Sequence, residues 1–250
     1  MDFHINIKKK SFIISHDKTT IDVLKNINIK IKSKEFVCIV GPSGCGKTTL
    51  MNIIGGLIKT EDQKINNKQH DLNSYGNFGY VFQTSRLLPW LTVRENIELV
   101  CEDNDEYVER VEFLLSEFDL QEFKNYYPKS ISGGMRRKVY LARALIKKPQ
   151  ILLMDEPFVS LDQPTSENLY SVLINYWKKN PITIILITHN VKEAILLGER
   201  IIFFSKRPAS VVYDHKIKSK TEGLSIDNNE IQKEYDQLKK KFPSLLRGLV

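Results

Sequence analysis

Hydrophobic residues gather in short uninterrupted runs along much of this chain, and glycine, proline or charged residues bound each run. Apolar runs without polar interruption are typical of strands that a parallel sheet buries on both faces. They predict strands at residues 36–40, 79–82, 151–154, 183–188 and 200–204. Helical spacing between these runs predicts helices at residues 47–54, 166–177 and 191–197. The alternation predicts an α/β fold with a mostly parallel sheet and helices on both of its faces.

Three other regions have different patterns. Ile alternates with polar residues near the N-terminus, which predicts an antiparallel β subdomain with strands at residues 3–7, 12–14 and 27–31. Val108, Val111, Leu115 and Phe118 recur at helical spacing in a long segment punctuated by prolines. A polar connector is expected at residues 60–77, a small β element at 211–217 and a polar helix at 228–241.

These patterns together predict one domain over residues 1–250. Its catalytic core would comprise residues 1–86 and 149–205, with an α-helical subdomain inserted at 87–148. Residues 206–250 would form a C-terminal extension. A chain of 250 residues is long enough to bury a core of this size.

Composition and charge narrow the class of protein only a little. With 42% hydrophobic and 27% charged residues, the chain has the composition of an ordinary globular protein. No stretch approaches the roughly 20 apolar residues that span a bilayer, and the three cysteines suggest neither a metal site nor a disulfide framework. We therefore expect a protein of the reducing cytoplasm. The net charge of +7 is compatible with nucleic acid, an anionic membrane surface or a merely solvated exterior.

The strongest chemical signal is a glycine-rich loop between the strand at 36–40 and the helix at 47–54. It fits G-x-x-x-x-G-K-[ST] over Gly41, Pro42, Ser43, Gly44, Cys45, Gly46, Lys47 and Thr48, with Thr49 directly after it. The glycines let successive backbone N–H groups point at phosphate oxygens, and the helix presents its positive end to them. Lys47 can reach the β and γ phosphates, and the Thr48 hydroxyl can bind Mg²⁺. We expect this whole segment to bind ATP.

Two acidic residues and a histidine follow other predicted core strands. Asp155 and Glu156 end the strand at 151–154, and His189 follows the strand at 183–188. Open α/β sheets bind ligands at the carboxyl ends of their strands, so these side chains are candidates for one site. Asp155 is placed to hold Mg²⁺, Glu156 to polarise an attacking water, and His189 to donate to the γ-phosphate or hold that water. Solvated acids and a structural histidine are the plain alternatives.

Further motifs follow one another in the order of a known family. Gln83 follows a strand, and Ser132, Gly133, Gly134 and Met135 head a helix. After Asp155-Glu156-Pro157 come Ser160-Leu161-Asp162 and then His189. Over nearly its full length the chain resembles the ATP-binding cassette (ABC) ATPases, which have a P-loop NTPase core with an inserted helical subdomain.

The resemblance implies roles for these residues. Ser132, Gly133, Gly134 and Met135 would be the signature that contacts the ATP of a second, identical chain in a head-to-tail dimer, with Asp162 in the D-loop. Thr48, Gln83 and Asp155 would hold Mg²⁺, and Gln83 would also sense the γ-phosphate. Phe12 would stack on adenine, although a Phe on a β-strand is more often a core residue. Hydrolysis would drive integral membrane permease subunits.

A finer resemblance is to the nitrate/sulfonate/taurine importers. It rests on residues 81–83 and 87–93 with Trp90, on Met135 where most ABC proteins have Gln, and on Arg207-Pro208. It implies import of a small solute, a substrate-binding protein that acts through the permease, and a peripheral place on the inner face of the cell membrane. An ABC exporter is the nearest alternative, and a soluble ABC protein acting on nucleic acid and a regulatory cassette are more distant ones.

Three departures from the family pattern are visible. Asn190 replaces the usual Asp after the switch histidine, which puts the orientation of His189 in doubt. Residues 59–64 lack the common glycine turn, and residues 11–25 are somewhat long, which blurs the alignment of Phe12. None of these departures removes a group that hydrolysis requires.

Overall fold

The computed structural model describes residues 2–13, 19–59, 63–65, 78–84, 86–101, 105–218 and 225–243. The chain divides into two compact units. Unit 1 comprises Met1–Tyr75 and Thr183–Val250, and unit 2 comprises Gly76–Ile182. The boundaries of core, helical subdomain and C-terminal extension given above stay predictions.

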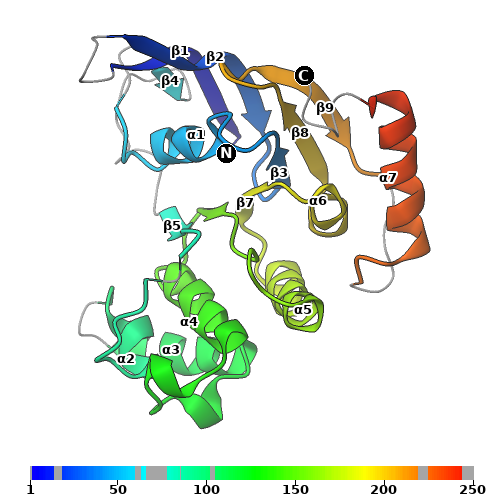
Figure 1. Cartoon of the computed structure of the whole chain (residues 1–250). Helices are drawn as coiled ribbons and strands as arrows, with labels where there is room; N and C mark the ends of the chain where they lie inside the picture. The colour runs from blue at the N-terminus through cyan, green and yellow to red at the C-terminus, as the bar shows by residue number, and fades with distance from the viewer. Residues whose placement is uncertain are drawn as a thin grey trace. The chain divides into compact units, whose positions relative to one another are not determined.

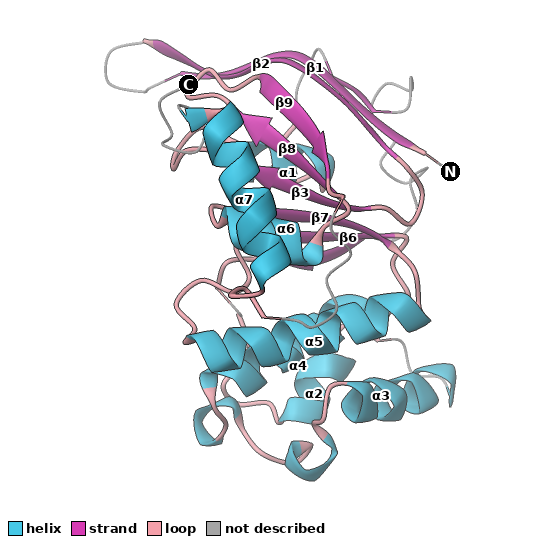
Figure 2. Cartoon of the chain, turned by 90° about the vertical axis from the view of Figure 1, so that its right-hand side faces the viewer, coloured by secondary structure: helices cyan, strands magenta, loops and turns pink. Residues whose placement is uncertain are grey.

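The first sheet of unit 1 has three strands that are almost fully buried, as the apolar runs predict, and a more exposed edge strand. Its strands are β3 (Phe36–Val40), β7 (Thr183–Thr188), β8 (Arg200–Phe204) and the edge strand β9 (Val211–Lys216). They lie in the order β7-β3-β8-β9; the first three are parallel, and β9 is antiparallel to β8. The helices of unit 1 are α1 (Lys47–Ile54), α6 (Val191–Leu197) and α7 (Asn229–Lys241). Figure 2 shows α6 and α7 on one face of these strands and α1 on the other.

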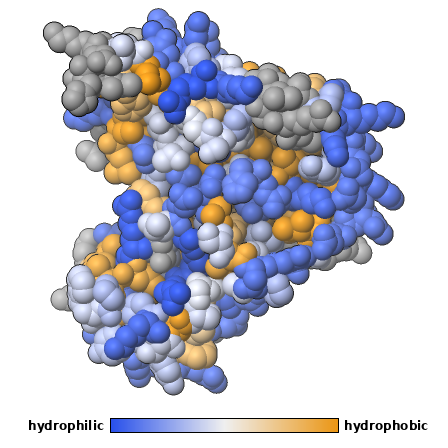
Figure 3. Space-filling model, in the orientation of Figure 1, coloured by the Kyte–Doolittle hydropathy of each residue, from blue (hydrophilic) through white to orange (hydrophobic). Residues whose placement is uncertain are grey.

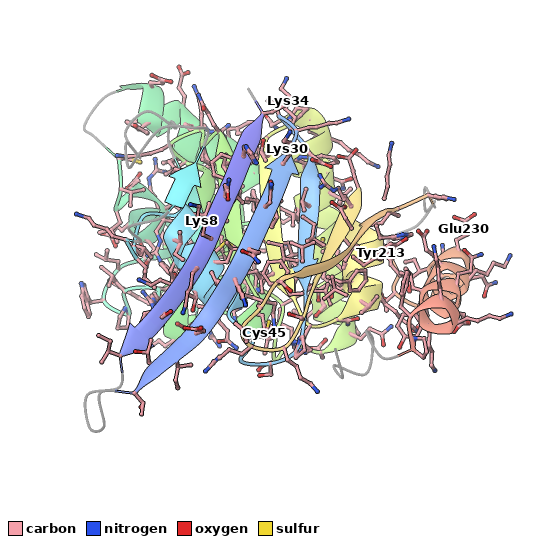
Figure 4. All side chains as sticks on the ribbon, turned by 90° about the horizontal axis from the view of Figure 1, so that it is seen from above. Lys8, Lys30, Lys34, Cys45, Tyr213 and Glu230 are labelled. Atoms are coloured by element: carbon pink, nitrogen blue, oxygen red, sulfur yellow. The ribbon has the colours of Figure 1, made fainter. Side chains whose placement is uncertain are left out.

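The second sheet of unit 1 is antiparallel, with β1 (Phe3–Ile13) between β2 (Thr20–Ile31) and β4 (Gln63–Ile65). The strands predicted at 3–7 and 12–14 are parts of one strand, whose register shifts between Lys10 and Ser11; residue 14 lies outside the described residues. Alternate residues of β1 and β2 are buried, while Lys8 and Lys30 are exposed (Figure 4). The predicted polar connector contains β4, and most of its other residues lie outside the described ranges.

Unit 2 contains two parallel strands and the chain's main group of helices. The strands are β5 (Phe78–Val81) and β6 (Ile151–Asp155). The helices are α2 (Val93–Glu98), α3 (Asp105–Glu117), α4 (Gly133–Leu145) and α5 (Gln163–Lys179), with short 3₁₀ turns η2 (Gln121–Phe123) and η3 (Pro128–Ser130). Figure 1 shows α2, α3 and α4 gathered into one cluster. Among the described residues, no helix is both long enough and apolar enough to cross a bilayer.

The apolar positions of α3 recur at the predicted helical spacing, and most of them are buried. Val111, Leu115 and Phe118 are fully buried, together with Leu114. Val108, at the same helical spacing, is 53% exposed. Val108 lies one turn before Val111, and the packed surface does not extend that far towards the start of α3. Helical spacing therefore identified the face correctly but not where along it the packing ends.

Candidate nucleotide site

The phosphate loop connects β3 to α1 in a backbone conformation that only glycine adopts easily. Gly44 has a φ of +72° and Gly46 a φ of +123°, both in the region that favours glycine. A Cβ on Gly46 would lie 2.7 Å from Cγ1 of Val23, and a Cβ on Gly41 would lie 2.9 Å from Cβ of Phe204. The loop therefore needs its glycines both for its curvature and for its close packing against β2 and β8.

The start of α1 is built to receive an anion. No side chain caps the helix at Gly46, so its first N–H groups point into the loop without a side-chain acceptor. Lys47 is only 5% exposed, and its Nζ donates to the carbonyl oxygens of Gly41 at 2.8 Å and Pro42 at 2.9 Å. The Thr48 side chain is exposed, as binding of Mg²⁺ through its hydroxyl requires. Burial raises the pKa of the Cys45 thiol, which keeps it neutral beside the loop.

His189 emerges at the same sheet edge as the phosphate loop. In the parallel pair β3–β7, Val40 is paired with Thr188, so the next residues, Gly41 and His189, leave the sheet together. The His189 side chain is exposed. Asn190 accepts hydrogen bonds from the backbone N–H groups of Lys192 (3.0 Å) and Glu193 (3.3 Å) and thus caps α6. Because Asn and Asp are equally good at this position, Asn190 preserves the cap that an Asp would make after the histidine.

Phe12 lies near the end of β1 in unit 1. Its side chain is 39% exposed, so it is not the core residue that the alternative interpretation expected. The Lys10 ammonium lies 5.0 Å from the centre of its ring. An exposed ring of this kind has a face on which a flat base can stack.

In unit 2, the acidic pair and Gln83 also emerge at one edge. Val81 is paired with Met154 in the parallel pair β5–β6, so residues 82–83 and 155–156 follow directly at that edge. Asp155 is 6% exposed. The pKa of Tyr80 is raised mainly by burial of Tyr80 and, to a smaller extent, by the negative charge of Asp155. Glu156 has a φ of +46°, a costly conformation for a residue with a side chain. Such strained residues cluster at functional sites.

The signature turn heads α4 as a regular helix start. The Ser132 hydroxyl is the N-cap and accepts a hydrogen bond from the Met135 N–H at 3.1 Å. A Cβ on Gly134 would lie 2.5 Å from Cγ2 of Thr165, so α5 requires a glycine there. A Cβ on Gly133 would meet no atom closer than 3.8 Å. Nothing in the described chain therefore requires a glycine at position 133.

Asp162 caps α5 beside this turn. Its carboxylate accepts hydrogen bonds from the Thr165 N–H and hydroxyl, each at 2.9 Å. These bonds lower the pKa of Asp162. They also fix the Thr165 side chain whose methyl group lies over Gly134.

The predicted site residues thus fall into two sets. Unit 1 brings together the phosphate loop and His189 and also contains Phe12. Unit 2 brings together Gln83, Asp155 and Glu156 at one edge, and the signature turn and Asp162 about the starts of α4 and α5. For Mg²⁺, the hydroxyl, amide and carboxylate oxygens of Thr48, Gln83 and Asp155 are suitable donors.

Sequence analysis missed two side chains that hold these segments. The Tyr140 hydroxyl of α4 accepts a hydrogen bond from the Phe82 N–H at 2.9 Å and so anchors the backbone just before Gln83. Arg207 donates to the Gly44 carbonyl of the phosphate loop. The Arg207-Pro208 pair was visible in the sequence, but its contact lies 163 residues away along the chain.

Comparison with known proteins identifies the family of this chain. The family model described as ABC transporter matches residues 24–159. The chain belongs to this family. It is 38% identical over 239 residues to the aliphatic sulfonates import ATP-binding protein SsuB of Bacillus thuringiensis subsp. konkukian, covering 95% of this chain and 93% of that one. It is also 38% identical to the taurine import ATP-binding protein TauB of Jannaschia sp., over 86% of this chain and 82% of that one.

A solved ABC structure has the same fold. The cassette MJ0796, in a dimeric post-hydrolysis state bound to ADP and Pi, superposes with a TM-score of 0.73 at 32% identity. The match covers 87% of this chain and 99% of that one. The predicted fold, a P-loop NTPase core with an antiparallel sheet and a group of helices, is confirmed. The chain is an ABC-type ATPase and the ATP-binding subunit of a transporter.

Proposed function

We propose that two copies of this ABC ATPase clasp two ATP molecules, each between the phosphate loop of one copy and the signature turn of the other. The observation that carries this proposal is the open space at Gly133, where no described residue lies close enough to require glycine. A missing side chain at an exposed helix start lets a large anion approach the backbone N–H groups closely. The chain already has one such anion site before α1, so the second is suited to the nucleotide of a partner copy.

Within the clasp, the chemical tasks of hydrolysis are divided among these residues. Lys47 neutralises the β and γ phosphates, residues 41–49 wrap them, and Phe12 stacks on adenine. Thr48, Gln83 and Asp155 would hold Mg²⁺, which would supply positive charge beside the phosphate oxygens. Glu156 accepts a proton from the attacking water, and His189 donates to the γ-phosphate. Asp162 holds the start of α5 next to the signature turn.

We propose further that hydrolysis drives import of a small sulfonate such as taurine. Support comes from the named relatives, which align with this chain over 82–93% of their own lengths. The closing and opening of the dimer would change the conformation of a permease, and a substrate-binding protein would deliver the solute to that permease. The chain would act on the inner face of the membrane. Nitrate and export remain the alternatives that transport assays distinguish.

The permease would dock in a groove on unit 2. A cavity of about 510 Å³ is lined by Phe78, Gly79, Tyr80, Phe82, Arg86, Leu88, Leu99, Val100, Tyr140, Arg143, Ala144 and Lys147. Leu99 and Val100 are 48% and 39% exposed, and hydrophobic patches interrupt the surface of this unit in Figure 3. Apolar side chains beside three cations suit a short helix of the permease with an apolar face and an acidic residue.

Transport by a reconstituted complex tests this function. The chain, tagged and purified with its permease, is placed in proteoliposomes, and ATP-dependent uptake of taurine, an alkanesulfonate and nitrate is measured. The substrate-binding protein is added on the side opposite to ATP, and we expect uptake of the sulfonates with the wild-type complex and none with the Glu156→Gln complex. Uptake of nitrate alone, or solute movement away from the ATP side, contradicts the proposed solute or direction.

The docking groove has its own matched pair of variants. Leu99→Asp with Val100→Asp places charge in the groove and should abolish uptake while the isolated chain keeps its ATPase activity. Val108→Asp changes an equally apolar, 53% exposed side chain on α3 outside the groove and should leave uptake unchanged. Equal uptake by both variants would reject the groove as the permease contact.

A further inference from the structure

The segment between β8 and β9 lies against the phosphate loop of unit 1. The guanidinium of Arg207 donates two hydrogen bonds to the Gly44 carbonyl oxygen, from Nη2 at 2.5 Å and from Nε at 3.1 Å. Just before it, Phe204 packs so tightly on Gly41 that a Cβ there would lie 2.9 Å from the Phe204 Cβ. The segment thus contacts the loop at its first residue and at its outer bend.

This segment is itself held at both ends. The Ser205 N–H donates to the Ser210 carbonyl at 3.0 Å, and the Ser210 N–H donates to Ser205 Oγ at 2.9 Å. The Ala209 N–H donates to the Val23 carbonyl at 2.8 Å, and the Lys25 N–H donates to the Ala209 carbonyl at 2.9 Å. Arg207 therefore projects from a short turn that two strands, β8 and β2, fix in place.

The bond to Gly44 fixes the direction of the next N–H group. In a trans peptide the C=O and the N–H of the same plane point in opposite directions. Because Arg207 holds the Gly44 carbonyl, the Cys45 N–H must point the other way, into the loop. The Cys45 N–H donates to the Pro42 carbonyl oxygen at 3.3 Å, a long hydrogen bond. A phosphate oxygen can replace this carbonyl as the acceptor. Cys45 is labelled in Figure 4.

We propose that Arg207 is a positioning residue for nucleotide binding. It keeps the flexible Gly44–Cys45 peptide turned so that the Cys45 N–H faces the phosphates before ATP arrives. Gly44 has a φ of +72°, and because glycine restricts the backbone little, this peptide could adopt other orientations. The hydrogen bonds from Arg207 hold it in one of them. A guanidinium suits it because its planar fork can give two donors to one oxygen.

The test compares ATP affinity and steady-state ATPase activity of the isolated chain. Arg207→Ala should raise the Kd and KM for ATP about tenfold, since a hydrogen bond from a charged donor contributes about this factor. Because the clamp acts on binding, kcat should stay within about threefold of wild type. Millimolar guanidinium should restore most of the lost affinity, and Arg207→Lys, with a single donor point, should be intermediate.

Lys206→Ala is the matched control. Lys206 is an exposed neighbour with the same charge, and among the described contacts its side chain makes no bond to the loop. We expect its ATP affinity to equal that of the wild type. Thermal melting of all three variants shows whether the unit stays folded.

Three outcomes would overturn the proposal. They are an Arg207→Ala affinity within twofold of wild type, an equal loss in Lys206→Ala, or a loss that guanidinium does not restore. The proposal rests on the assignment of the loop to ATP, and Lys47→Ala separates the two. If Lys47→Ala binds ATP normally, the assignment of the loop to ATP is wrong. If Lys47→Ala loses ATP binding but Arg207→Ala binds normally, only the proposal about Arg207 is wrong.

Discussion

The phosphate loop before α1 and the signature turn before α4 both place glycines at the start of a helix, but for different reasons. Gly44 and Gly46 have positive φ values, and α1 has no side-chain cap. Neither Gly133 nor Gly134 has a positive φ, and Ser132 caps α4 in the ordinary way. The first turn needs glycine for its backbone, whereas the second needs it for the space that a side chain would fill.

This difference separates a site that is complete in one chain from a site that needs a partner. The phosphate loop is held within its own chain, by the hydrogen bonds of the Lys47 ammonium and by packing on Val23 and Phe204. The signature turn is packed on one side only, where Gly134 meets Thr165, and is open at Gly133. Four predictions can break or sharpen this comparison.

The largest effect is expected for substitution of Glu156. Stopping hydrolysis there should also keep ATP bound between the phosphate loop and the signature turn, so that the dimer can be detected. Glu156→Gln keeps the size of the side chain but removes the base, and general bases contribute about 10²–10⁴-fold to rate. We therefore expect turnover to fall about a thousandfold while ATP stays bound and the dimer accumulates. Phosphate release and size-exclusion chromatography measure both. Near-normal turnover would disprove the assignment of the base.

Lys47→Ala tests the turn that is complete in one chain. It removes the cation from the phosphates and should weaken ATP binding about a hundredfold, which corresponds to about 3 kcal/mol. Titration with a fluorescent ATP analogue measures this. Lys30→Ala, which removes an exposed lysine from β2, serves as the charge control. Unchanged ATP binding by Lys47→Ala would show that the phosphate loop is not the ATP site.

Ser132→Arg tests the turn that needs a partner, and it is best made in the Glu156→Gln background. A long side chain at the helix start should block the partner's triphosphate, so the ATP-dependent dimer should weaken at least about tenfold. Binding of ATP to the monomer should change little, since the phosphate loop is untouched. Size-exclusion chromatography with and without MgATP distinguishes the two. A dimer of normal strength would place the second turn away from the interface.

The smallest and sharpest effect comes from the two signature glycines. Gly134→Ala should lower the free energy of unfolding by about 1–3 kcal/mol, because its Cβ meets a Thr165 methyl that Asp162 holds in place. Thr165→Ser removes that methyl group and should restore the stability of Gly134→Ala. Gly133→Ala should raise stability by about 0.5 kcal/mol and yet reduce ATPase activity and dimer formation.

Chemical denaturation and ATPase assays of the same samples measure both quantities for these variants. The comparison fails if Gly133→Ala keeps full activity, or if it loses stability as Gly134→Ala does. Thr165→Ser alone is the control for loss of the methyl group without added volume.

Much of the fold was predictable because its signals are local. Residues 36–40, 183–188 and 200–204 are strands with the predicted bounds, since uninterrupted apolar runs leave few other structures. The start of α5 was placed at Ser166 although Asp162 and Pro164 are helix-start residues that could have located it at Gln163. The strand β4 was missed because its three residues, Gln63–Ile65, have no apolar pattern of their own.

The site was predictable only as a set of segments. Motif order identified the phosphate loop, the acidic pair and the signature turn, and sheet register explains why members of each set share an edge. The Arg207 clamp and the Thr165 methyl over Gly134 are tertiary contacts, and no periodicity in the sequence encodes them. Sequence shows which residue types are present, while the reason for each glycine depends on its neighbours in space.

The buried Lys47 ammonium donates hydrogen bonds to two carbonyl oxygens of its own loop. These two oxygens solvate a buried charge whose removal from water would otherwise be costly. A neutral nucleoside offers this lysine nothing better than what it already has, whereas a polyphosphate does. We therefore expect Lys47 to strengthen the binding of ATP but not that of adenosine, which would depend on stacking against Phe12.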